Sequence, residues 1–200
     1  MKPGVRITGG EFRGRGLTVA PGTRPTEGRV REALFSIWSD RLEGARVLDL
    51  FAGSGAVALE AVGRGALNAL AVDGDVRVVK TLEANAARLG KRLIEIRRLN
   101  LPSGLSRLVG EKAGPFDLVF ADPPYDFNLY AELLQGVVPL LAADAEIAVE
   151  HSSRRELPLE IASLTRVDVR RYGESAVSFY RRGPAQVYAL VGEEDVDESP

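Results

Sequence analysis

The sequence predicts one α/β core in which a mostly parallel sheet carries helices on both faces. Strand-like apolar runs alternate with helical patterns from Arg46 to about residue 150, an order that is typical of parallel sheets covered by helices. No internal repeat occurs, and no linker is long enough to separate two large domains. The last stretch lacks helices between its strand-like runs, which predicts an antiparallel edge to the sheet.

The segment before this core predicts a small β-hairpin followed by a helix. Residues 5–20 alternate, with glycines between the apolar residues and arginines on the opposite face. Thr26 can cap the following helix, and the negative charge of Glu27 is favourable near the positive N-terminal end of that helix. The apolar positions at helical spacing are Val30, Ala33, Leu34, Ile37 and Trp38. On that pattern Arg29 and Arg31 lie off the apolar face.

Within the core, the pattern predicts each element in turn. The expected parallel strands are residues 47–51, 69–73, 93–96, 116–121 and 147–149, and the expected helices are about 53–64, 75–89 and 128–141. The expected antiparallel edge comprises residues 165–171, 176–182 and 186–191. In such open sheets, ligands bind beyond the carboxyl ends of the strands.

Composition narrows the possible functions. The 200 residues include no cysteine and a single histidine, His151, which excludes disulfides, cysteine nucleophiles and the usual multi-histidine metal sites. The stretch Gly53-Ser54-Gly55-Ala56 does not match the Gly-x-Ser-x-Gly nucleophile elbow. A Ser-His-Asp hydrolase is therefore not expected, and we expect no metal. His151 is interpreted as a strand-end residue.

Charge and hydropathy bear on location and partners. The net charge is −2, but residues 1–41 carry eight basic and four acidic side chains, a balance of +4. Residues 193–200 carry five acids and no base, which is typical of a solvated, disordered tail. No apolar run approaches the roughly 18 residues of a membrane span, and the first residues lack a hydrophobic signal core. We expect a cytoplasmic protein with no membrane partner.

Two features at predicted strand ends indicate a nucleoside site. The turn from Asp49 to Gly55 follows the first strand of the core, and its glycines would let the backbone approach a ligand closely. Asp73 ends the second strand, twenty residues after Gly53, where an acid can accept both ribose hydroxyls. A tight packing turn and a helix cap are the alternative explanations. A nicotinamide nucleotide or a sulfonium nucleoside would satisfy both features.

The stretch Asp122-Pro123-Pro124-Tyr125 decides between these ligands. Prolines fix the backbone and remove N–H donors, so the carbonyls of Asp122 and Pro123 would be presented rigidly at the end of the fourth strand. Oxygen acceptors of this kind could hold both hydrogens of an exocyclic amine on a base. Tyr125 offers a ring on which the base could stack, worth about 1–3 kcal/mol. A simple strand stop would explain the turn but not the spacing from the acid to the aromatic residue.

With these residues assembled, the chain resembles the bacterial 16S ribosomal RNA guanine-N2 methyltransferases. The resemblance covers roughly residues 5–190. Its motifs are Arg6-Ile7-Thr8-Gly9-Gly10, Arg13-Gly14-Arg15, Arg24-Pro25-Thr26, Arg29-Val30-Arg31-Glu32, Asp49 to Gly55, Asp122 to Tyr125 and Tyr172-Gly173. The amino-terminal arginine blocks are its specific part, because the other motifs occur in many methyltransferases. The implied fold is a Rossmann-like class I methyltransferase with a seven-stranded sheet.

The resemblance also implies the chemistry and the residues that carry it. S-adenosylmethionine would donate a methyl group to the N2 amine of a guanine in 16S RNA, within a small ribosomal subunit or an assembly intermediate, and the protein would act as a monomer. The implied catalytic residues are Asp122, Pro123, Pro124 and Tyr125, and the implied cofactor-binding residues are Asp49, Phe51, Gly53, Gly55, Asp73 and Asn100. The implied RNA-binding residues are Arg6, Arg13, Arg15, Arg24, Arg29 and Arg31. Arg29 or Thr26 could instead reach the cofactor carboxylate.

This interpretation divides the chain and leaves alternatives. Residues 1–42 would form an RNA-binding extension, residues 43–192 the methyltransferase domain, and residues 193–200 the acidic tail. A DNA adenine-N6 or cytosine-N4 methyltransferase would use the same Asp-Pro-Pro-Tyr chemistry, but it usually needs a larger target-recognition region. A non-catalytic RNA-binding or assembly factor is the alternative from another class. A nicotinamide oxidoreductase would have no use for the amine-holding corner.

Overall fold

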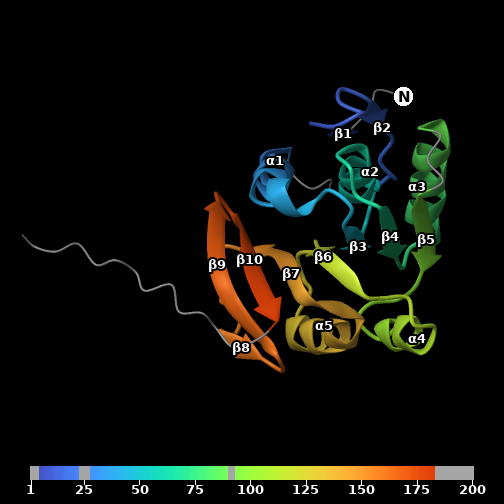
Figure 1. The fold of residues 1–200 in the computed structure, drawn as a ribbon. Helices are drawn as coiled ribbons and strands as arrows, with labels where there is room; N and C mark the ends of the chain where they lie inside the picture. The colour runs from blue at the N-terminus through green and yellow to red at the C-terminus, as the bar shows by residue number, and fades with distance from the viewer. Residues whose placement is uncertain (1–4, 23–27, 90–92, 183–200) are drawn as a thin grey trace, which may run out of the picture.

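The computed structural model describes residues 5–22, 28–89 and 93–182. An eight-stranded sheet runs through the molecule in the order β5-β4-β3-β6-β7-β10-β9-β8, with helices on both faces (Figure 1). Its strands are β3 (Arg46–Leu50), β4 (Asn68–Asp73), β5 (Ile94–Arg98), β6 (Phe116–Ala121), β7 (Leu141–Ser152), β8 (Glu160–Ile161), β9 (Leu164–Tyr172) and β10 (Ser175–Arg182). The helices are α1 (Gly28–Ile37), α2 (Ala56–Gly63), α3 (Val76–Arg88), α4 (Leu105–Gly110) and α5 (Tyr130–Val137), with short 3₁₀ turns η1 (Ser39–Arg41) and η2 (Val138–Leu140).

The direction of the strands follows the prediction. The strands β5, β4, β3, β6 and β7 are parallel to their neighbours, whereas β10, β9 and β8 pair antiparallel. The sheet has one strand more than the seven expected. The additional strand is the short edge strand β8, in which Ile161 pairs with Leu164 of β9 and packs on the core. The further strand predicted at residues 186–191 lies outside the described residues, as does the acidic tail.

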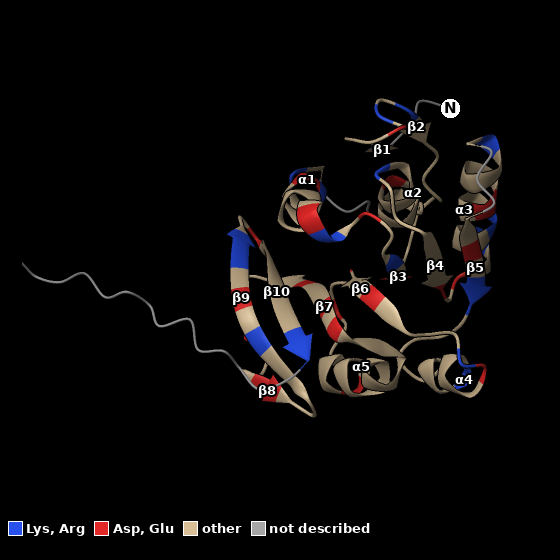
Figure 2. Ribbon diagram, viewed as in Figure 1, with Lys and Arg blue, Asp and Glu red and all other residues tan. Residues whose placement is uncertain are grey.

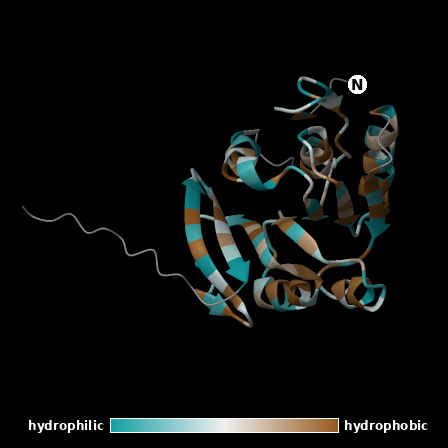
Figure 3. Ribbon diagram, in the orientation of Figure 1, coloured by the Kyte–Doolittle hydropathy of each residue, from teal (hydrophilic) through white to brown (hydrophobic). Residues whose placement is uncertain are grey.

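Side-chain alternation along the parallel strands gives two cores, one on each face. Leu48 and Val119 face α4 and α5, while Val47 and Phe120 face α1 and α2. Residues on successive positions of a strand point to opposite faces, so strands covered by helices on both sides must be apolar throughout. Figure 3 shows this as strongly hydrophobic colouring of the central strands. Within the described ranges, no helix has the length and apolar character needed to cross a membrane.

The predicted amino-terminal hairpin is present, and it packs on α2 and α3. Strands β1 (Val5–Arg6) and β2 (Gly16–Leu17) pair antiparallel. A third apolar cluster joins the hairpin to the two helices; its buried members are Val5, Ile7, Phe12, Leu17, Ala56, Leu59 and Ala86. Gly10 has φ +69°, and a Cβ there would lie 2.3 Å from the Gly63 carbonyl oxygen. The close approach of the hairpin to the end of α2 therefore requires glycine at this position.

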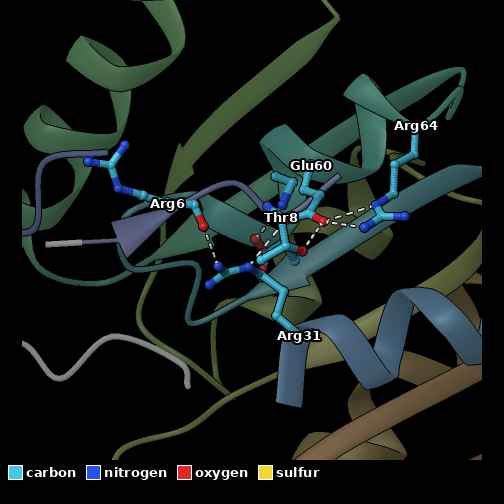
Figure 4. Close-up of polar contacts among 7 residues, drawn as sticks. Arg6, Thr8, Arg31, Glu60 and Arg64 are labelled. Atoms are coloured by element: carbon cyan, nitrogen blue, oxygen red, sulfur yellow. Dashed lines mark hydrogen bonds and ion pairs between the residues drawn. The ribbon is translucent and has the colours of Figure 1, made fainter. Parts of the chain in front are cut away.

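The buried carboxylate of Glu60 fastens this hairpin and α1 to α2 (Figure 4). Glu60 is 0% exposed. Its carboxylate accepts hydrogen bonds from the Thr8 N–H (2.9 Å) and hydroxyl (2.5 Å). Arg31 Nε donates at 3.3 Å, and Arg64 donates twice, at 2.9 and 2.6 Å. Donors from three parts of the chain thus compensate one buried charge.

The expectation that Arg31 lies off the apolar face is wrong. Arg31 is 2% exposed, and it donates to the Arg6 carbonyl oxygen (2.5 Å) as well as to Glu60. A buried arginine of this kind is held by its carboxylate and carbonyl acceptors. We therefore remove Arg31 from the residues expected to contact RNA.

Substitution of Glu60 by alanine tests this arrangement. Because it leaves Arg31 buried without a carboxylate, we expect E60A to lower the free energy of unfolding by about 3–5 kcal/mol. The matched control is E95A, which removes a carboxylate from the exposed Arg97–Glu95 pair (2.5 Å) and should cost at most about 1 kcal/mol. Urea unfolding of both variants measures the difference. Equal losses would show that Glu60 does not hold the extension.

Candidate active site

The turn from β3 into α2 has the backbone that the glycines predict. Gly53 and Gly55 adopt φ +55° and +78°, and Phe51 has φ +60°. A Cβ on Gly55 would also lie 3.0 Å from Leu82 Cγ of α3. Left-handed conformations are open to glycine at little cost, so this chain can turn sharply at the carboxyl end of β3, where α2 begins.

Asp73 braces the same turn from the end of β4. Its Oδ2 accepts a hydrogen bond from the Gly53 N–H (3.1 Å), and its Oδ1 accepts one from the Asp75 N–H (3.0 Å). The helix cap considered as an alternative role belongs to Asp75, which accepts from the Arg77 N–H in the first turn of α3. Each carboxylate oxygen can accept more than one hydrogen bond. Asp73 therefore retains acceptor capacity toward a ligand.

Asp49 is a buried carboxyl group under this turn. It is 2% exposed, and its Oδ2 accepts from the Ala58 N–H in α2 at 3.0 Å. Burial raises its pKa to about 7, the hydrogen bond from Ala58 opposes the rise, and the charges of Asp122 and Asp73 add to it. The three carboxyl groups thus interact at the carboxyl ends of β3, β4 and β6.

The stretch Asp122 to Tyr125 forms a fixed corner after β6. The Asp122 N–H donates to the Leu50 carbonyl oxygen (3.3 Å), and the Phe127 N–H donates to the Pro124 carbonyl oxygen (2.9 Å). Pro123 is buried, whereas Tyr125 is 63% exposed. The corner therefore joins the end of β6 to the end of β3 and presents an aromatic ring to solvent.

An aromatic series connects this corner to the glycine turn. The rings of Phe51 and Phe127 meet edge to face at 5.3 Å, and those of Phe127 and Tyr130 at 5.0 Å. Pairs of this geometry contribute about 0.5–1.5 kcal/mol beyond their buried area. Phe51, one of the predicted cofactor-binding residues, thus also packs against the residue that closes the corner.

Asn100 follows β5 at the same edge of the sheet. The side chain is exposed, and a Cβ on Gly74 would lie 2.9 Å from its Oδ1. Asn100 therefore lies against the loop that begins at Asp73. The structure brings together at this edge all of the predicted catalytic and cofactor-binding residues: Asp49, Phe51, Gly53, Gly55, Asp73, Asn100, Asp122, Pro123, Pro124 and Tyr125.

Asn85 of α3 is a site residue that the sequence analysis missed. It is 1% exposed, and its Nδ2 donates to the carbonyl oxygens of Ser54 and Thr18, both at 2.9 Å. Its Oδ1 accepts from the Thr18 N–H at 3.0 Å. The side chain thus links the glycine turn to the hairpin. An asparagine at a core position of the α3 pattern, beside Leu82 and Ala86, was the only signal for it.

The predicted RNA-binding arginines separate into different environments. Arg6, Arg13, Arg15 and Arg29 are exposed, and Figure 2 shows blue segments in the hairpin loop and both blue and red segments in α1. Arg6 Nη1 donates to the Gly14 carbonyl oxygen (3.0 Å), inside the hairpin. Arg24 lies outside the described residues, with Thr26. Arg31 is the buried residue described above.

His151 is the last residue but one of β7. Its Nδ1 is 2.9 Å from the Ser152 carbonyl oxygen, and its Nε2 is 2.8 Å from Ser178 Oγ. A carbonyl oxygen can only accept, so Nδ1 carries the proton and Nε2 accepts from the serine hydroxyl. Burial lowers the pKa of His151, which favours the neutral ring. Its interpretation as a strand residue is confirmed.

Comparison with protein families then decides the relationship. Residues 5–181 match the family described as "Conserved hypothetical protein 95". The chain belongs to this family. Ribosomal RNA small subunit methyltransferase D of Escherichia coli K12 is 36% identical over 197 residues, which cover 96% of this chain and 94% of that protein. The resemblance to ribosomal RNA methyltransferases is thereby confirmed at the level of the family.

Solved structures agree on the fold. The E. coli protein described as "Putative methyltransferase yhhF" has a TM-score of 0.78 and 35% identity, covering 90% of this chain and 98% of that one. The protein SMU.776, solved in complex with SAH, has a TM-score of 0.66 at 15% identity, covering 85% of this chain and 52% of that one. The Rossmann-like class I methyltransferase fold predicted from the sequence is confirmed.

The raised pKa of Asp49 predicts a pH-dependent stability. The folded-state pKa of about 7 exceeds the ordinary value of 3.8, so the folded protein binds this proton more tightly than the unfolded chain does. The stabilisation that the bound proton provides is fully present below about pH 4 and is lost as the pH rises to 7. The D49N variant keeps an oxygen for Ala58 but cannot ionise. We expect the free energy of unfolding of D49N, relative to that of the wild type, to increase by about 1.4 kcal/mol per pH unit between about pH 4 and 7. Urea unfolding at pH 5, 6 and 8 measures it; a difference independent of pH would contradict it.

Proposed function

We propose that this protein transfers a methyl group from S-adenosylmethionine to the exocyclic N2 amine of a guanine in 16S ribosomal RNA. The observation that carries the proposal is the Asp122–Tyr125 corner, held beside the glycine turn and Asp73 by the Asp122–Leu50 hydrogen bond. A nucleoside at the turn and an amine at the corner would lie next to each other. The E. coli relative is named a methyltransferase of the small-subunit ribosomal RNA, which favours RNA as the substrate.

The residues around the turn suit the proposed cofactor. Asp73 would accept hydrogen bonds from the ribose hydroxyls, and Gly53 and Gly55 let the backbone approach the methionine end. Asn100 would contact the adenine. A cationic ligand also suits the neighbourhood of Asp49, because an opposite charge stabilises the ionised form of a carboxyl group whose pKa is raised by burial. S-adenosylmethionine supplies an electrophilic methyl group on a sulfonium sulfur.

The corner would position the amine for direct displacement. The Asp122 side chain and the backbone carbonyls of Asp122 and Pro123 accept its hydrogens, which aims the nitrogen lone pair at the methyl carbon. The C–N bond forms as the C–S bond breaks with its electron pair going to sulfur, and the nitrogen gives up one proton to Asp122 or to water. Tyr125 stacks on the base. Positioning of this kind can supply roughly 7–11 kcal/mol of a barrier.

A methyl-transfer assay tests the proposal. Labelled S-adenosylmethionine is incubated with small subunits that lack the modification, with naked 16S RNA or with duplex DNA, and the products are digested to nucleosides. N2-methylguanosine from the ribosomal substrates is the expected product, and the relative rates show which form of RNA is used. Methylated adenine or cytosine from DNA would assign the chain to DNA modification. Absence of any transfer would favour a non-catalytic RNA-binding factor.

Replacing Asp122 separates chemistry from cofactor binding. We expect D122A to lose transfer by at least about 10²-fold while S-adenosylmethionine binds within about threefold of wild type, because general-base and positioning contributions are of this size. Isothermal titration gives the cofactor affinity and single-turnover assays give the rate. An equal loss of cofactor binding would show that Asp122 mainly organises the cofactor pocket.

Charge reversal in the hairpin tests the RNA contact. The R13E/R15E variant should bind 16S RNA more weakly, and the slope of log K against log salt should become shallower by roughly 0.7–0.9 for each phosphate that the variant no longer neutralises. The control R107E/K112E reverses two exposed cations on and just after α4 and should leave the slope unchanged. Unchanged binding of R13E/R15E at low salt would remove the hairpin from the RNA footprint.

A further inference from the structure

A second group of arginines lies at the edge of the sheet that carries the corner. Ala121 of β6 pairs with Val149 of β7, so β7 continues past the corner to Ser152. Ser152 pairs with Ser175, which in turn pairs with Tyr172 at the tip of the β9–β10 hairpin. The residues just beyond β7 and the last residues of β9 therefore lie on the β7 side of the corner (Figure 1).

Arg155 packs on Tyr130, next to the residue that closes the corner. Its guanidinium carbon lies 5.1 Å from the centre of the Tyr130 ring, which contacts Phe127. The Arg155 N–H donates to the Ser152 carbonyl oxygen (2.9 Å), and the Arg154 N–H donates to Ser152 Oγ (3.3 Å). These bonds fix the turn after β7, so both arginines leave the sheet at a defined place.

Arg171 faces the same side of the sheet as Arg155. His151, Ala176 and Arg171 lie in one row across β7, β10 and β9, and side chains in one row share a face. The rings of His151 and Tyr130 are 6.4 Å apart on that face. Burial is the main cause of the lowered pKa of His151, and the positive charges of Arg166, Arg155 and Arg171 lower it further, as expected for cations near one ring.

These arginines differ from neighbouring arginines in their partners. Arg166 pairs with Glu156 (3.5 Å) and Arg170 with Asp168 (2.7 Å). In the part of the chain that the structure describes, the exposed residues Arg154, Arg155 and Arg171 form no ion pair. We call these three residues the β7–β9 arginine surface. Arg155 is held over the Tyr130 ring, and among the described residues none of the three cations has a carboxylate partner, which suits an external anion.

We propose that the β7–β9 arginine surface binds phosphates of the RNA whose base enters the corner. This rests on the proposed function. The amino-terminal hairpin packs on α2 and α3, over the β3–β5 part of the sheet, whereas this surface lies on the β7–β9 part (Figures 1 and 2). The corner on β6 lies between them. An RNA held by both would be fixed on each side of the target base, and arginine suits phosphate because it donates in a planar fork.

The R155E/R171E variant tests the proposal against R107E/K112E. At about 0.1 M salt we expect the KM for the RNA substrate to rise at least tenfold, while kcat at saturating RNA and S-adenosylmethionine affinity stay within about threefold. The slope of log K against log salt should become shallower by roughly 1.4–1.8, for two phosphate contacts. The neutral variant R155Q/R171Q should show the same change of slope with a smaller rise in KM. Because R155Q/R171Q introduces no acid, it also controls for misfolding caused by the two new carboxylates of R155E/R171E.

The outcomes distinguish this inference from the proposed function. Unchanged KM and salt slope in both variants, with an active wild-type enzyme, would overturn the arginine surface and leave methyl transfer standing. A wild-type protein that methylates no RNA would overturn the proposed function. The arginine surface could then still be tested by filter binding of 16S RNA, because the slope of log K against log salt would differ between the wild type and the variants. Weakened binding of duplex DNA, with RNA binding unaffected, would also overturn it.

Discussion

The position of the amino-terminal extension depends on one buried charge. Glu60 is enclosed by Thr8, Arg31 and Arg64, and its carboxylate accepts hydrogen bonds from all three. A buried carboxylate without such donors would cost several kcal/mol. The extension must therefore dock on α2 in one orientation, because only that orientation supplies Thr8 and Arg31. The exposed arginines of the hairpin then have a fixed place relative to the corner.

The helix α2 connects the docked extension to the candidate active site. It begins at the glycine turn, where Asp49 holds the Ala58 N–H, and it ends against the hairpin, where the Glu11 N–H donates to the Gly63 carbonyl oxygen (2.7 Å). Asn85 makes a second link between turn and hairpin. The division predicted at residue 42 stays a prediction, but the parts on its two sides share buried polar contacts. The glycine turn and the hairpin are thus both held by hydrogen bonds to α2.

The sequence patterns predicted those elements whose structure depends mainly on residues close together in the chain. The strand at residues 116–121 was predicted with the bounds that β6 has, because a doubly covered strand is mostly apolar and only Asp117 interrupts this run. The pattern failed for Arg31, since the partner that buries it lies 29 residues away in Glu60, and no local spacing reveals such a pair. It also missed α4, whose six residues bury only Leu105 and Leu108, too few for a periodic signal.

The candidate site combines residues whose individual motifs are common, so its specificity must come from how they are joined. Phe127 closes the corner through its bond to Pro124, contacts Phe51 of the glycine turn and contacts Tyr130, on which Arg155 lies. Small displacements are expensive in a close-packed series of this kind. The corner therefore cannot shift without disturbing either the turn or the β7–β9 arginine surface. For direct methyl transfer, which depends on alignment more than on a strong base, this coupling would hold the cofactor loop, the target amine and the RNA backbone in one fixed geometry.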